Sequence, residues 1–178
     1  MKNLKKINLL AISLFSLSVF ALENIAVIDM RTAVLSTQAA ENALKALEED
    51  STYAANLEEA QTLQAERQSI AENFEKNRET LSQEEIAKMQ KDIQDKGKDL
   101  EFIAGKLQQA QEETIQRIFA ENSASMQKII SELIQAKEIQ ILFQKSESIL
   151  FSDVAIDLTD DVTSMMDVAA SEANTQPE

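Results

Sequence analysis

The stretch from residue 38 to residue 137 constrains the fold of this chain more than any other part of it. In its second half, apolar side chains recur at alternating intervals of three and four residues, which is the heptad period of a coiled coil. These seam positions are Ile86, Met89, Ile93, Lys96, Leu100, Ile103, Leu107 and Ala110. The aliphatic stem of Lys96 can lie along the seam while its charge stays in water. The pattern predicts a long helix whose apolar stripe is covered by another helix.

The start of this helix is marked by the segment from Leu81 to Ile86. Ser82 is placed to accept a hydrogen bond from the backbone amide of Glu85, and Glu85 is placed to accept one from the amide of Ser82. Leu81 and Ile86 occupy the two positions of a hydrophobic staple. We therefore predict a helix that begins directly after Ser82.

The preceding arm carries a matching seam, so the two arms are predicted to form an antiparallel helical hairpin with its tip near 77–82. Its positions are Leu47, Ala54, Leu57, Leu63, Arg67, Ile70, Phe74 and Leu81. With the turn centred near Thr80, residues whose numbers add to about 160 should face each other, as Phe74 and Ile86 do. The first arm is expected to be one helix of roughly 40 residues, about 60 Å long at 1.5 Å per residue.

The composition favours a coiled coil over a compact enzyme. The chain has two glycines, one proline, no cysteine and no histidine. Cysteine–histidine and serine–histidine nucleophilic sites and the usual zinc and haem ligands are therefore absent, and no phosphate-binding loop motif occurs. We expect no enzyme activity, no catalytic residue, no cofactor and no metal. Asp157, Asp160 and Asp161 could form an acidic metal site, but the start of a helix accounts for them better.

The N-terminus has the features of a secretory signal peptide at 1–21. Lys2, Lys5 and Lys6 precede an apolar run, and Val19-Phe20-Ala21 predicts cleavage after Ala21. Removal of these three lysines takes the net charge from −14 to −17. Such an acidic protein is not expected to bind nucleic acid or anionic membrane surfaces. We expect an exported, soluble protein.

The flanks of the hairpin are predicted to form a small body from two separated segments, 22–37 and 138–170. Short strands are expected at Ile25–Ile28, at 139–145 and at 149–151. A final helix should begin at Asp157–Val162 with Thr159 as its cap, and the polar residues 171–178 are expected to form a disordered tail. This core is small and its sheet edges are open, so we expect the chain to oligomerise.

Phe102 lies beside the seam position Ile103 and not on the seam itself. An exposed phenylalanine on a projecting arm can contact another protein. A single exposed aromatic side chain is also common on ordinary protein surfaces, so both interpretations stay open.

The order of the parts resembles the Skp/OmpH family of periplasmic chaperones. The resemblance is carried by Ile25-Ala26-Val27-Ile28-Asp29-Met30, the hairpin, Ile141-Leu142-Phe143, Ser148-Ile149-Leu150-Phe151 and the segment from Asp153 to Val162. It implies a mainly α fold with a small β body, in which long helical hairpins project from a barrel-like homotrimer. The strand residues expected at the subunit contacts are Ile25, Val27, Ile28, Ile139, Ile141, Phe143, Ile149 and Phe151.

The same resemblance implies an ATP-independent holdase of the periplasm that holds unfolded outer-membrane β-barrel proteins in a cavity between the arms. Relatives in this family are typically basic, whereas this chain is acidic. We therefore assign no anion-binding site to the interleaved lysines and aspartates between Lys88 and Asp99. The alternative is a structural coiled-coil spacer or adaptor of an envelope export machine.

Overall fold

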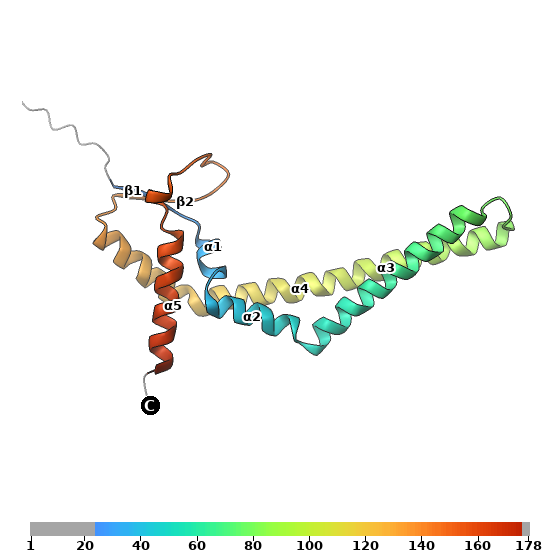
Figure 1. Cartoon of the computed structure of the whole chain (residues 1–178), viewed down its shortest axis with the longest axis horizontal. Helices are drawn as coiled ribbons and strands as arrows, with labels where there is room; N and C mark the ends of the chain where they lie inside the picture. The colour runs from blue at the N-terminus through green and yellow to red at the C-terminus, as the bar shows by residue number, and fades with distance from the viewer. Residues whose placement is uncertain (1–23, 176–178) are drawn as a thin grey trace, which may run out of the picture.

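The computed structural model describes residues 24–175 as a long helical arm attached to a small mixed body. Figure 1 shows the arm, formed by α3 (Ser51–Asn77) and α4 (Gln83–Ala136), projecting away from the strands and from α5 (Thr159–Thr175). The predicted signal peptide at 1–21, with its cleavage after Ala21, lies outside the described residues. The mainly helical fold with a small sheet agrees with the fold class predicted from the sequence.

The longest element, α4, spans 54 residues and joins the arm to the body. A helix of that length extends about 80 Å at 1.5 Å per residue. Its first part faces only α3, whereas its last part packs against α1, α2 and α5. The apolar face broadens accordingly, so that Ile118, Ile129 and Leu133 near the body are buried.

The segment that was predicted to form the first helix of the hairpin is not one continuous helix. It divides into α2 (Gln38–Glu48) and α3, and the chain bends sharply between them (Figure 1). Asp50 adopts an extended backbone conformation, and its side chain accepts hydrogen bonds from the amides of Thr52 and Tyr53, both at 2.9 Å. An aspartate in this position begins a new helix, because it satisfies backbone donors that have no partner inside that helix.

The sheet contains two parallel strands, β1 (Ile25–Ile28) and β2 (Ile141–Gln144). Ile25 lies opposite Ile141, and Ile28 lies opposite Gln144. A single bridge between Val27 and Asp157 extends β1 on its other side. Within the described residues there is no strand at 149–151, so that prediction is wrong; this segment runs from a turn at Ser146–Ile149 to the short helix η1 (Val154–Ile156). The apolar side chains of Leu150 and Phe151 find no neighbouring strand in this chain and remain exposed.

The core of the body lies where α1 (Met30–Leu35), α4 and α5 (Thr159–Thr175) meet beneath β1. Its buried residues are Ile28, Ala33, Val34, Ala40, Ile118, Ile129, Leu133, Val162 and Met166. They come from the consecutive elements β1, α1 and α2 and from the distant helices α4 and α5, because α4 brings residues 118–133 back to the segment that begins at β1. This core fixes the base of the arm.

The disordered tail predicted from Ser171 is wrong in its first five residues, because α5 continues to Thr175. Val162 and Met166 of α5 are buried against the core, which anchors the first two turns. No glycine or proline occurs between Thr159 and Thr175 to end the helix sooner. Thr159 is the first helical residue and not the cap that we expected; its hydroxyl accepts a hydrogen bond from the amide of Asp29 at 2.9 Å.

Candidate functional site

The tip of the arm carries the capping arrangement predicted from its sequence. The Ser82 hydroxyl oxygen accepts a hydrogen bond from the amide of Glu85 at 3.3 Å, and Glu85 Oε2 accepts one from the Ser82 amide at 2.8 Å. The Ser82 hydroxyl also donates to Glu85 Oε2 at 2.7 Å, and these hydrogen bonds lower the pKa of Glu85. The start of α4 is therefore fixed by local interactions that need no other part of the molecule.

The seam residues predicted on α4 face α3 along the arm. Ile103 is buried, and the remaining members are half-buried, because a single neighbouring helix leaves part of most seam side chains open to solvent. These members are Ile86, Met89, Ile93, Lys96, Leu100, Leu107 and Ala110. Lys96 forms an ion pair with Glu66 of α3, so its charge is held at the border of the seam.

On α3 the seam differs from the prediction near the base of the arm. Leu57 is 44% exposed, and Tyr53, Asn56 and Ala60 take its place between the helices. Residues 53, 56, 60, 63, 67, 70 and 74 form one unbroken alternation of three and four, and Leu57 lies one position beyond it. Tyr53 was missed as a seam residue although this spacing could have revealed it. Its hydroxyl accepts a hydrogen bond from Gln111 Nε2 at 2.6 Å.

The contacts across the arm also correct the predicted register. Glu66 pairs with Lys96, Arg67 lies against Gly97, and Tyr53 bonds to Gln111, so that facing residues have numbers adding to 162 to 164. The predicted value was about 160. The two helices are therefore shifted by about one turn relative to the prediction, and on this register Phe74 lies opposite Met89. Phe74, Ile70 and Ile86 are half-buried in this register too, because a heptad seam presents an apolar side chain at every turn.

Phe102, for which both a protein contact and an ordinary surface position were left open, is 65% exposed on the surface of the arm. Its ring is covered on one face by Lys106, whose Nζ lies 4.4 Å from the ring centroid. This distance is typical of a cation–π interaction. A ligand that used this face of the ring would have to displace the ammonium group.

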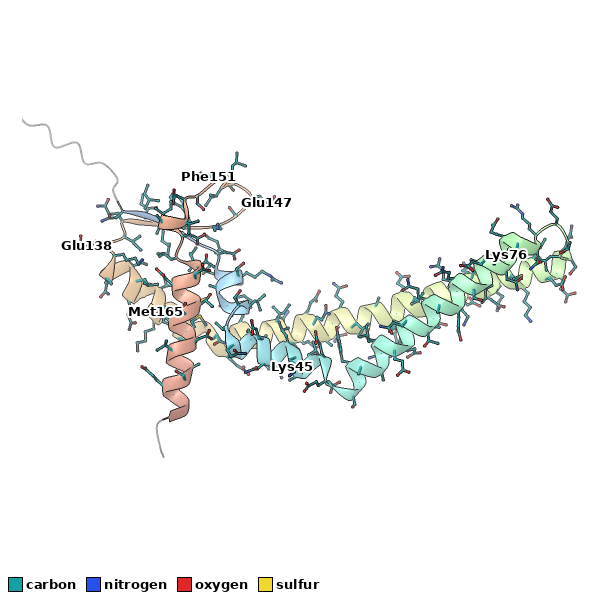
Figure 2. All side chains as sticks on the ribbon, in the orientation of Figure 1. Lys45, Lys76, Glu138, Glu147, Phe151 and Met165 are labelled. Atoms are coloured by element: carbon teal, nitrogen blue, oxygen red, sulfur yellow. The ribbon has the colours of Figure 1, made fainter. Side chains whose placement is uncertain are left out.

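The loop between β2 and η1 holds the most exposed apolar side chains of the body. Leu150 is 96% exposed and Phe151 is 84% exposed, and Val154 and Phe143 are also open to solvent. Figure 2 shows Phe151 on this loop, pointing away from the body. Such a cluster on a short chain is typical of a surface that another protein covers.

The residues that we expected at subunit contacts thus fall into three groups. Val27 and Ile28 are buried inside this chain and cannot contact a second copy directly. Ile25, Ile139, Ile141 and Ile149 are half-buried, and Phe143 and Phe151 are exposed. Phe143, Phe151 and the open edge of β2 therefore form the part of the body that a partner can contact.

A polar network ties the end of β1 to the start of α5. Lys145 Nζ lies 2.6 Å from Asp157 Oδ2, and Asp157 Oδ1 accepts hydrogen bonds from the amide and the hydroxyl of Thr159 at 3.0 and 2.6 Å. Burial alone would raise the pKa of Asp157, but the hydrogen bonds from Lys145 and Thr159 outweigh it and lower the pKa. The Asp157 ion pair in turn raises the pKa of Lys145. Hydrogen bonds from Thr32 lower the pKa of Asp29 at the same end of β1.

A cleft of about 350 Å³ lies between the last part of α4 and α5. Its floor is apolar, with Ile129, Met165 and Val168, and Lys128 and Glu132 stand at its border. No group of three or more histidine, cysteine, aspartate or glutamate side chains among residues 24–175 is placed to hold a metal ion. None of the helices in that range is long and apolar enough to cross a membrane.

The family model for outer membrane proteins of the OmpH-like type matches residues 24–166, which includes the arm and nearly all of the body. The chain belongs to the OmpH-like family. The resemblance inferred from the terminal segments and the hairpin is therefore confirmed.

Among solved structures, this OmpH-like protein is similar to a candidate outer membrane chaperone (OmpH-like) from Caulobacter crescentus CB15, with 20% sequence identity and a TM-score of 0.46. The alignment covers 84% of this chain and 86% of that one. No curated protein matches the sequence.

Proposed function

We propose that this protein is an ATP-independent holdase chaperone of the periplasm, which binds unfolded outer-membrane β-barrel proteins between the arms of a homotrimer. Family membership supports this proposal, because it relates the chain to outer membrane proteins of the OmpH-like type. The observation that carries it is the combination of a long, solvated arm with a body whose exposed apolar loop needs a partner.

The arm is suited to weak and reversible contact with an unfolded chain. Its two helices bury one seam and leave polar side chains over most of their surface, so the arm can surround a client and stay soluble. Apolar side chains on its surface are few, and Leu57 and Phe102 are the large ones that are exposed in the described part of the arm. Weak contacts made by such an arm can release a client without energy from ATP.

The body is suited to self-association. Leu150, Phe151 and Val154 form an apolar surface next to a two-stranded sheet, and a sheet of this size is marginal when isolated. Covering this loop and the edge of β2 with further copies of the chain would complete a larger sheet and bury these side chains. The proposal assigns neither catalysis nor a cofactor to the protein.

The decisive experiment dilutes an unfolded outer-membrane β-barrel protein out of urea, with and without the purified chain from residue 22 onward, and follows aggregation by light scattering without nucleotide. We expect suppression at a stoichiometry of one trimer to one client. If aggregation is unchanged while the protein is folded and trimeric, the holdase proposal is wrong and the spacer or adaptor alternative is favoured.

Native mass spectrometry tests the assembly separately. Phe151→Asp combined with Leu150→Asp should convert the trimer into monomers, because charges would be buried at the subunit contact. Ser148→Asp combined with Glu147→Gln changes exposed side chains of the same loop and should leave the trimer intact. A trimer that survives the first pair of substitutions would place the subunit contact elsewhere.

A further inference from the structure

The arm has two flanks, one on each side of the seam, and the contacts across the hairpin identify them. Arg67 lies over Gly97 and Tyr53 bonds to Gln111 on one flank, which we call the amide flank. Glu66 pairs with Lys96 on the opposite one, which we call the charged flank. In an antiparallel pair of helices, residues that directly follow matching seam positions of the two helices lie on the same flank of the pair. The heptad spacing along each helix therefore identifies the other residues of each flank.

The amide flank carries few charged side chains. On α3 its positions are Leu57, Gln61, Gln64, Gln68, Ala71 and Glu75. On α4 they are Gln90, Gln94, Gly97, Glu101, Ala104 and Gln108. Arg67 lies among them with its guanidinium against Gly97.

The charged flank has the opposite character. Its positions on α3 include Glu59, Thr62, Glu66 and Ser69, and those on α4 include Asp92, Asp95, Asp99 and Lys106. Phe102 belongs to this flank and lies beneath Lys106. Of the charged side chains on the two flanks, most therefore lie on the charged flank. A coiled-coil seam does not require this, because it needs only polar side chains on both flanks.

Four glutamine side chains of the amide flank are available to a ligand. Gln61, Gln64, Gln90 and Gln94 are exposed and make no side-chain hydrogen bond to another residue within 24–175. Gln68 donates to Glu72 at 3.0 Å, and Gln108 donates to Glu112 at 2.8 Å. A hollow of about 300 Å³ lies on this flank, lined by Gln64, Arg67, Gln68, Ala71 and Ile93. Each free carboxamide offers two donors and an acceptor, and the small side chain of Ala71 allows another chain to approach closely.

The chemistry that matches this surface is an unfolded polypeptide. Every residue of an unfolded chain carries an unpaired backbone N–H, except proline, and an unpaired C=O. Carboxamides bind both groups and do not discriminate between side chains, and a surface with few charges repels an acidic client less than the charged flank does. The charged flank of a protein with a net charge of −14 would repel an acidic chain.

We propose that the amide flank is the client-facing surface of the arm and binds the backbone of an unfolded polypeptide, while the charged flank faces solvent. The inference rests on the proposed function and adds which flank of the arm contacts the client. It also moves the client contact away from Phe102, because that side chain lies on the charged flank.

The test compares two variants of the full trimer that add the same charge to opposite flanks of α3. The amide-flank variant is Gln61→Glu with Gln64→Glu, and the control is Thr62→Glu with Ser69→Glu. All four side chains are exposed, and glutamate is a good helix former, so both variants should fold. Circular dichroism and native mass spectrometry verify this before binding is measured.

Affinity for a fluorescent, acidic, unfolded outer-membrane protein is measured by anisotropy at low salt. We expect the amide-flank variant to bind about tenfold or more weakly, which corresponds to the loss of one or two hydrogen bonds and added repulsion, and the control to stay within about twofold of the wild type. Equal losses in both variants, or a larger loss in the control, would overturn the inference.

A photocrosslinking residue at Gln64 or at Ser69, each in an otherwise unchanged chain, gives an independent measurement. The client should crosslink from position 64 and not from position 69. Crosslinking from both, or from 69 alone, would contradict the inference but leave the holdase proposal intact. Failure of the wild type to bind any client would instead overturn the proposed function, and the inference with it.

Discussion

At the scale of single residues, burial separates side chains that look alike in the sequence. Ile118 and Leu57 both belong to apolar patterns on long helices, but Ile118 is buried in the body and Leu57 is 44% exposed on the arm. Ile118 lies where α4 meets α1, α2 and α5, so a cavity at this position cannot be filled by the relaxation of one helix.

Ile118→Ala should therefore destabilise the protein by about 2–5 kcal/mol, the usual cost of removing a large aliphatic side chain from a packed core. Leu57→Ala should change stability by about 0.5 kcal/mol or less, as exposed substitutions normally do. Urea unfolding followed by circular dichroism at one protein concentration measures both. Similar costs for the two substitutions would show that the arm base is not the main core of the molecule.

The network around Asp157 predicts a pH dependence of stability. Its pKa is lowered below the ordinary value of 3.8 in the folded protein, so the stabilisation is complete above that value and is lost as the pH falls through the lowered pKa. Asp157→Asn removes the ion pair with Lys145 and should flatten the loss of stability between about pH 4 and pH 2. Thermal unfolding at several pH values checks this, with Glu147→Gln as a control in the neighbouring loop. An unchanged pH profile in Asp157→Asn would contradict the role assigned to the network.

At the scale of elements, the register of α3 against α4 is the feature that the structure changes most. A heptad seam presents apolar side chains at every turn, so shifts by one turn keep most of the seam covered. The contacts Glu66–Lys96 and Arg67–Gly97 select one of these registers, and they place Phe74 opposite Met89.

Cysteine crosslinking distinguishes the two registers. Phe74→Cys with Met89→Cys should form a disulfide faster and in higher yield than Phe74→Cys with Ile86→Cys, because a disulfide needs closely spaced Cα atoms. Gel mobility under non-reducing conditions reports the yield. The opposite order would restore the register predicted from the sequence. Phe74→Cys with Leu107→Cys, about five turns away along α4, serves as the negative control.

At the scale of the whole molecule, the acidic net charge determines the long-range electrostatic interaction between the protein and its clients. The net charge is −14, and none of the residues after Lys145 is basic. An acidic client is therefore repelled at long range and held by short-range contacts that do not depend on charge, such as those proposed for the amide flank.

Salt tests this description, because the Debye length falls from about 30 Å at 0.01 M to about 10 Å at 0.1 M. Binding of an acidic unfolded outer-membrane protein should strengthen or stay constant over that range. A steep fall of affinity with salt would show that attraction between opposite charges drives capture. A client of the same length with added lysines provides the comparison, and its affinity should decrease as salt rises.

The sequence alone determined the features that depend on neighbouring residues. The capping box of Ser82 and Glu85, the seam of α4 and the strand at Ile25–Ile28 follow from side chains within a few positions of one another. Local hydrogen bonds and helical spacing are the same in any tertiary context, so these predictions did not require the rest of the chain. The break at Asp50 belongs to the same class, although we missed it.

The tertiary structure decided what depends on distant segments meeting. It buried Val27 and Ile28 inside the chain, extended α5 to Thr175 and exposed Leu57. It also fixed the hairpin register, which places Phe74 opposite Met89. In each case several arrangements satisfy the same local sequence pattern. The packing of α4 against its neighbouring helices gives the observed arrangement the lowest free energy.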